Sequence, residues 1–327
     1  MPRCTSRNGG RRFRIAVAAL AAAASVGLSA CSSSTDDAGG EGGGGAAGGT
    51  STAVGDMSKW PKTVADSGLV KGLTLPLQPY MQTYQDSMTI ERAARTLETE
   101  CMAGYGFTVV FPPVGVNPPP NADDANMPRR YGLSDRAAAA TYGYQLPPDA
   151  TEHPAPPQLS PAAVAVLTGR KGNNPRAEAA PSTYKGRKVP EGGCQAQAFD
   201  KLGARIDFTL PSRLDHESLV RSQEDPRVRS SLGAWSACMK GKGYTVADPF
   251  AAADIAAEKA TGDPTQEEIT LALADIDCKK ETDLVAVWHR VDAEIQARQV
   301  EENQLALQQL KDRNSKAVKA AEAALRG

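Results

Sequence analysis

The sequence predicts a mainly α-helical fold with short strands (α+β), in which one helix–strand–helix unit occurs twice. Three observations lead to this prediction: apolar residues recur at helical spacing, a nine-residue element is repeated, and four cysteines lie beyond an N-terminal lipobox. Aromatic residues make up only 5% of the chain, which also contains 30 Gly and 23 Pro. Much of the chain should therefore be linker or loop, and we expect disulfides, a long C-terminal helix and a disordered N-terminal tether.

Residues 1–30 have the composition of a lipoprotein signal peptide. Residues 1–14 contain five arginines and no acid, and an apolar stretch follows over residues 15–28. At the end of that stretch, Leu28-Ser29-Ala30-Cys31 has the pattern of a bacterial lipobox. The apolar stretch is shorter than the roughly 20 residues that span a bilayer as a helix. We therefore expect cleavage before Cys31, diacylation of that cysteine, and anchoring to the outer face of the cell membrane. The export route, Sec or twin-arginine at Arg11-Arg12, stays open.

The mature chain is expected to be mildly acidic and tethered. Without the five arginines of residues 1–30, the 37 basic and 38 acidic side chains of the sequence leave a net charge of −6. This argues against nucleic-acid binding, which needs a basic face. Residues 31–58 are rich in Gly, Ser and Ala and should form a flexible tether with a reach of roughly 25–30 Å.

The body is expected to contain two repeat units and an arm. The first unit covers 59–210 with a Pro-rich insertion at 112–193, the second covers 211–290, and a C-terminal helical arm covers 291–327. In the first unit, ordered structure should begin near Leu73. A helix is expected over 89–103, where an apolar stripe precedes Gly104, and a strand over 107–111.

Capping signals place the next helices. Ser160 and Pro161 should start a short helix that Gly169 ends, and a further helix should cover 195–202. Asp225-Pro226 should start a helix that buries Val228, Leu232 and Trp235, followed by a strand over 244–246.

Residues 265–325 contain few helix breakers and should form one or two helices. Leu284, Trp288, Val291 and Ile295 form a heptad-like apolar seam, and Trp235 and Trp288 should lie in the core. The seam fades beyond Arg298, so the last part is expected to project into solvent, either as a solvated arm or as a partner for another helix.

The repeated element predicts how the cysteines pair. Residues 101–109 (CMAGYGFTV) match residues 238–246 (CMKGKGYTV) at six of nine positions, and each copy is followed by one more cysteine. Cys4 leaves with the signal peptide and Cys31 is lipidated, so four cysteines remain in an oxidising compartment. Of their three possible connectivities, the repeat favours Cys101–Cys194 with Cys238–Cys278.

A family resemblance rests on three features. The CM-x-G-x-G-aromatic element, the segment Val189-Pro190-Glu191-Gly192-Gly193-Cys194 and the lipobox together resemble secreted lipoproteins of high-GC Gram-positive bacteria. The resemblance covers most of residues 73–290. It implies an envelope location and paired cysteines, and it carries over no catalytic residue.

The sequence contains no recognisable catalytic, cofactor or metal motif. The three histidines (His153, His216 and His289) are scattered, and no Cys-x-x-Cys pair, nucleophile elbow or Walker loop occurs. Asp123-Asp124 lacks the glycine and the spaced acids of a calcium loop. Asp215-His216-Glu217 is the nearest approach to an acid–base cluster, and we interpret it as a solvated helix face.

Three functions follow from these observations as hypotheses. The leading one is a non-enzymatic, lipid-anchored protein that binds or organises an envelope component, with an envelope protein or cell-wall glycan as partner. The alternative is a small-molecule or glycan-binding accessory lipoprotein, with its site between the repeats or under the Pro-rich insertion and with Tyr131, Tyr142 and Tyr144 as contacts. The third is a cell-wall hydrolase that uses acids such as Asp215 and Glu217. The oligomeric state is not predicted.

Overall fold

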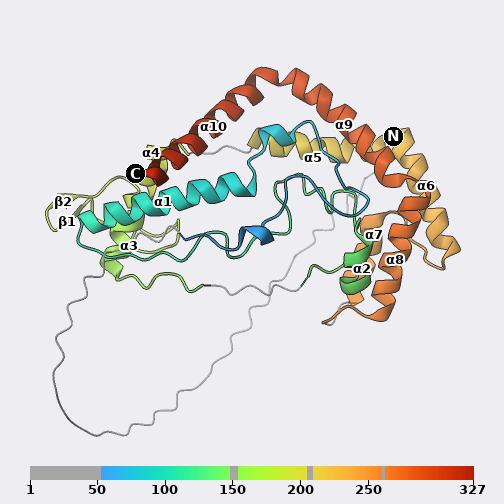
Figure 1. Cartoon of the computed structure of the whole chain (residues 1–327), viewed down its shortest axis with the longest axis horizontal. Coiled ribbons are helices and arrows are strands. Elements are labelled where there is room, and N and C mark those ends of the chain that lie inside the picture. Colours follow the sequence, from blue (N-terminus) through green and yellow to red (C-terminus); the bar gives the residue numbers. More distant parts are fainter. Residues whose placement is uncertain (1–52, 148–153, 205–208, 260–261) are drawn as a thin grey trace, which may run out of the picture. The chain divides into compact units, whose positions relative to one another are not determined.

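The computed structural model of the chain describes residues 53–147, 154–204, 209–259 and 262–327 (Figure 1). The expected signal peptide, the lipidation at Cys31 and most of the tether lie outside the described residues, as does His153. The described residues belong to one compact unit.

The described part of the chain is mainly α-helical, with very little strand, as predicted (Figure 1). In chain order the elements are η1 Met57–Lys59, η2 Gln78–Tyr80, α1 Tyr84–Gly104, α2 Arg136–Tyr142, α3 Pro161–Thr168, β1 Thr183–Tyr184, β2 Arg187–Lys188, α4 Gly193–Leu202, α5 Thr209–Glu224, α6 Pro226–Gly241, α7 Pro249–Lys259, α8 Gln266–Glu281, α9 Leu284–Glu302 and α10 Gln304–Arg326.

The N-terminal end of the described chain is ordered earlier than expected. Val54 forms a bridge with Val114, and the indole nitrogen of Trp60 donates a hydrogen bond of 2.9 Å to the Gly115 carbonyl. The expected tether boundary at residue 58 is therefore too late, and so is the start of the body near Leu73. The extended residues around Val54 have a partner in the Pro-rich insertion, which no local sequence pattern reveals.

Helix α1 begins at Tyr84 because the Thr83 hydroxyl accepts a hydrogen bond from the Asp86 amide and caps the helix. This start is earlier than the predicted residue 89. Along one side, α1 packs against α10 and α4, and the contact consists largely of small side chains. Close packing of Ala93 and Ala94 against Ala317 and Ala321 places all four in the core.

The C-terminal part of the chain is helical, as predicted, but the part beyond Arg298 does not project into solvent. Residues 266–326 form three helices rather than one or two, and α10 lies along α1 (Figure 1). Leu307 and Leu310 are buried, whereas Leu305 is 74% exposed. Where the leucine pattern ends, the buried face of α10 consists of small residues, Ala317 and Ala321, which pack against α1.

The two predicted strands, 107–111 and 244–246, are not formed: neither segment pairs with a partner strand among the described residues. Among the described residues the one sheet is the antiparallel pair β1–β2 inside the Pro-rich insertion. Val109 and Val246 are nevertheless buried. Side-chain burial, without a hydrogen-bonded ladder, accounts for the β-branched pattern in both segments.

The repeated element forms the same turn in both copies. The Phe107 amide donates to the Met102 carbonyl at 3.1 Å, and the Tyr244 amide donates to the Met239 carbonyl at 2.9 Å. Gly106 and Gly243, at φ of 81° and 93°, supply the left-handed residue that this helix end requires. The repeat is therefore a helix followed by a Schellman-type turn, with no strand.

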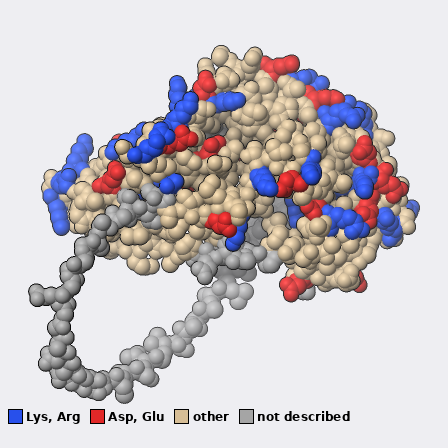
Figure 2. All heavy atoms as spheres, in the orientation of Figure 1, with Lys and Arg blue, Asp and Glu red and all other residues tan. Residues whose placement is uncertain are grey.

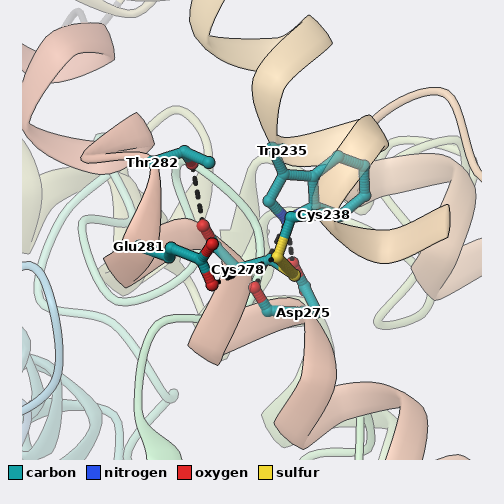
Figure 3. Close-up of a disulfide and its surroundings, with 6 residues drawn as sticks. All are labelled: Trp235, Cys238, Asp275, Cys278, Glu281 and Thr282. Carbon is teal, nitrogen blue, oxygen red and sulfur yellow. Dashed lines mark hydrogen bonds between the residues drawn. A yellow bond between two sulfur atoms is a disulfide. The ribbon is translucent and has the colours of Figure 1, made fainter. Parts of the chain in front are cut away.

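Both disulfides pair as predicted. Cys101 is bonded to Cys194 and Cys238 to Cys278, each with Cα atoms 5.7 Å apart. Figure 3 shows the second bond beside Trp235, whose ring nitrogen donates to Asp275. Cys194 lies in the first turn of α4, whereas Cys278 lies in the last turn of α8. The duplication thus covers the helix end and its disulfide but not the arrangement of the partner helix.

The main core forms around the two tryptophans predicted to lie there. Trp235 and Trp288 are fully buried, and the whole seam from Leu284 to Ile295 is buried with them. Tyr131 and Tyr144, from the Pro-rich insertion, belong to the same core. The insertion is therefore part of the body, and it contains the unpredicted helix α2.

Candidate functional site

A buried charge network fixes the Pro-rich insertion to the helices. Arg130 forms ion pairs with Asp215 of α5 at 2.9 Å and with Asp292 of α9 at 2.6 Å, and all three side chains are buried. The Tyr131 hydroxyl donates to Asp292 at 3.0 Å. Burial raises the pKa of Asp215, while the Arg130 guanidinium opposes that rise.

This network corrects the interpretation of Asp215-His216-Glu217. Asp215 points into the protein, so it does not lie on a solvated face. Glu217 forms an ion pair with Arg213 at the surface, and His216 is exposed. The acid–base pair suggested for a hydrolase is therefore divided between the core and the surface.

A second network lies beside the Cys238–Cys278 disulfide. The Lys279 ammonium, 1% exposed, donates to the Leu133 carbonyl at 2.7 Å and to Asp275 at 3.1 Å. The Tyr144 hydroxyl also donates to Asp275, at 3.1 Å. These bonds fix both ends of α2 to α8. They also correct the tyrosine hypothesis, because buried Tyr131 and Tyr144 are structural and not available to a ligand.

A cavity of about 650 Å³ lies where the insertion meets the N-terminal segment. It is formed by residues from two parts of the chain, 60–70 and 120–147. Its apolar lining includes Trp60, Val70, Leu133 and Leu146, and its polar lining includes Arg129. A volume of this size is in the range of small-molecule sites, which combine apolar walls with a few polar groups.

Four charged residues line the cavity: Lys62 and Asp66 form an ion pair with each other, Asp135 caps α2, and Arg129 is the fourth. Its guanidinium donates to the carbonyl oxygens of Tyr144 and Gln145, the latter at 2.8 Å. It forms no ion pair with a carboxylate of the described residues. Burial lowers the pKa of Arg129, but a guanidinium keeps its charge in proteins. An unneutralised, half-buried guanidinium is suited to bind an anion.

Trp60 forms a fixed wall of the same cavity. Its indole nitrogen is bonded to Gly115, and its ring meets the ring of Tyr84 edge-on with centroids 5.3 Å apart. A Cβ atom on Gly115 would lie 2.5 Å from the indole, so glycine is required for this close approach. The ring is therefore held in place before any ligand binds.

Basic side chains cluster on one part of the surface. Figure 2 shows Lys and Arg gathered at the left of the view, where β1 and β2 lie in Figure 1. The exposed basic residues of this segment are Arg170, Lys171, Arg176, Lys185, Arg187 and Lys188. They lie away from the cavity residues in the sequence and do not line it.

The remaining candidate residues are accounted for by local contacts. A His289 ring nitrogen is 2.8 Å from the Thr74 carbonyl, and Asp123 accepts hydrogen bonds from Gln78 and the Ala125 amide. Within the described ranges, no group of three or more His, Cys, Asp or Glu could hold a metal ion. None of the described helices is long and apolar enough to cross a membrane.

Comparison with known proteins gives no relative: no family model, curated protein or solved structure matches this chain.

Proposed function

We propose that this chain is a non-enzymatic, lipid-anchored binding protein on the outer face of the cell membrane. The lipobox at Cys31, the Gly-rich tether and the paired cysteines support the location. The cavity beneath the Pro-rich insertion is the single observation that carries the binding role. It combines a fixed Trp60 wall with the unneutralised Arg129 guanidinium.

The chemistry of the cavity indicates a ligand with one anionic group and an apolar or sugar-ring face. Arg129 would bind a carboxylate through its planar fork, and Trp60 would contact the ring face. A cell-wall fragment that carries a carboxylate, such as a muropeptide, meets both requirements. The packing of α10 against α1 makes a free helix-binding arm a weaker explanation.

Tryptophan fluorescence of the full chain, purified in a non-ionic detergent, tests this proposal. Trp60 is half-buried at the cavity, whereas Trp235 and Trp288 are fully buried elsewhere, so Trp60 would report binding. We expect saturable quenching by a muropeptide mixture and about tenfold weaker binding by R129K, which keeps the charge but loses the fork. R176K, at an exposed site, is the matched control. Equal binding by wild type and R129K, or no saturable change, would contradict the proposal.

A further inference from the structure

A second cavity, of about 450 Å³, lies between α1, α4 and the segment that follows α1. Its lining includes Glu91, Arg95 and Glu98 from α1, Phe111 from the following segment, and Phe199 from α4. It lies beside the Cys101–Cys194 disulfide, because Glu98 is one helical turn before Cys101. The disulfide fixes α1 against α4 at this point.

Glu98 is unusual among the acidic residues of the described chain. Its side chain is 95% removed from solvent, at 5% relative exposure, yet its carboxyl forms no hydrogen bond or ion pair with another described residue. Buried carboxylates are normally paired, because an uncompensated buried charge is costly. The carboxyl lines the cavity, so a ligand there can reach it.

The charged groups that act on Glu98 lie on its own helix. Arg95 forms an ion pair with Glu91 and donates a hydrogen bond to the Pro112 carbonyl. Arg95 attracts the Glu98 charge and Glu91 repels it. The elements that face Glu98 across the cavity contribute uncharged groups, namely Phe111 and, from α4, Gln195 and Phe199. The cavity lining therefore has a net charge of −1 with aromatic rings on two sides.

From this arrangement we propose that the cavity is a binding site for a small organic cation, a quaternary or primary ammonium. Glu98 supplies the countercharge and Phe111 and Phe199 supply aromatic faces, the combination by which proteins recognise ammonium groups. This site is separate from the Arg129 cavity, since the two share no lining residue.

Titration calorimetry of the full chain with choline and tetramethylammonium tests the proposal. The carbon isostere of choline, in which carbon replaces the quaternary nitrogen, controls for apolar binding, and sodium chloride controls for ionic strength. We expect saturable binding of choline, at least tenfold weaker binding of its isostere, and at least tenfold weaker choline binding by E98Q. F199L should weaken choline binding about two- to thirtyfold, the range of a cation–π contact.

Two further measurements separate the site from a structural role of Glu98. E100Q, at an exposed position of the same helix, should bind choline like the wild type. Burial raises the pKa of Glu98 to about 7, so wild-type affinity should fall about tenfold between pH 8 and pH 6, and E98Q should show no such fall. Absence of binding by both cations, or equal binding by wild type and E98Q, would overturn the proposal.

Discussion

Replacement of Glu98 by glutamine should stabilise the protein, by an amount that grows as the pH rises above about 4.5 and levels off above about pH 7. Burial, with repulsion from Glu91, raises the pKa of Glu98 from 4.5 to about 7, although Arg95 opposes the shift. The folded state therefore holds this proton more tightly than the unfolded state does, so the Glu98 contribution falls as pH rises from 4.5 to 7. A difference of 2.5 pH units corresponds to roughly 3 kcal/mol.

Denaturant unfolding of wild type and E98Q across this pH range measures the effect. The two proteins should have similar unfolding free energies near pH 4.5, and E98Q should be more stable by about 3 kcal/mol at pH 8. Other carboxyls titrate in both proteins and cancel in the difference. E100Q should show no comparable pH dependence. A stability difference that is constant with pH would refute the reasoning.

Three further changes test the packing of the body. K279M should destabilise by about 3–5 kcal/mol because it leaves Asp275 buried without its ion pair, and D275N/K279M should recover much of that loss in denaturant unfolding. G243A should cost about 1–2 kcal/mol of unfolding free energy from its left-handed backbone alone, since nothing lies within 4 Å of the added Cβ atom; no change in melting temperature would contradict this. C101S/C194S, which opens a 93-residue loop, should lose about 4–5 kcal/mol in the chain-entropy model, with retained cooperative unfolding as the check that the rest of the fold persists.

Local signals in the sequence predicted those features that local contacts determine. Ser160, Pro161 and Gly169 place the ends of α3 because each acts on the backbone within one turn. The disulfide pairing was predictable because the repeat placed two cysteines in equivalent settings. The two strand predictions were wrong because a strand depends on a distant partner. A β-branched run forms a strand only when a partner strand pairs with it, and the segments after α1 and α6 have none.

The candidate sites were not predictable, because they depend on contacts between distant residues. Arg130 and Asp292 are 162 positions apart, and no local sequence pattern near either residue predicts that they pair. No sequence pattern singles out Trp60, Arg129 or Glu98. Arg129 and Glu98 are candidate binding groups because no opposite charge pairs with them in the folded protein. A single sequence does not show which charged side chains will be paired.

The Pro-rich insertion shows why composition alone misjudges this chain. Its prolines and glycines favour extended backbone, and we expected loops there. Two buried charge networks nevertheless fix it, through Arg130 on one side and through Tyr144 and Leu133 on the other. The cavity with Arg129 lies beside these attachments, and it is lined by the loop that precedes α2 and by α2 itself. The segment with the weakest helical propensity is thus both firmly attached and incompletely packed, which is the combination that a preformed ligand site requires.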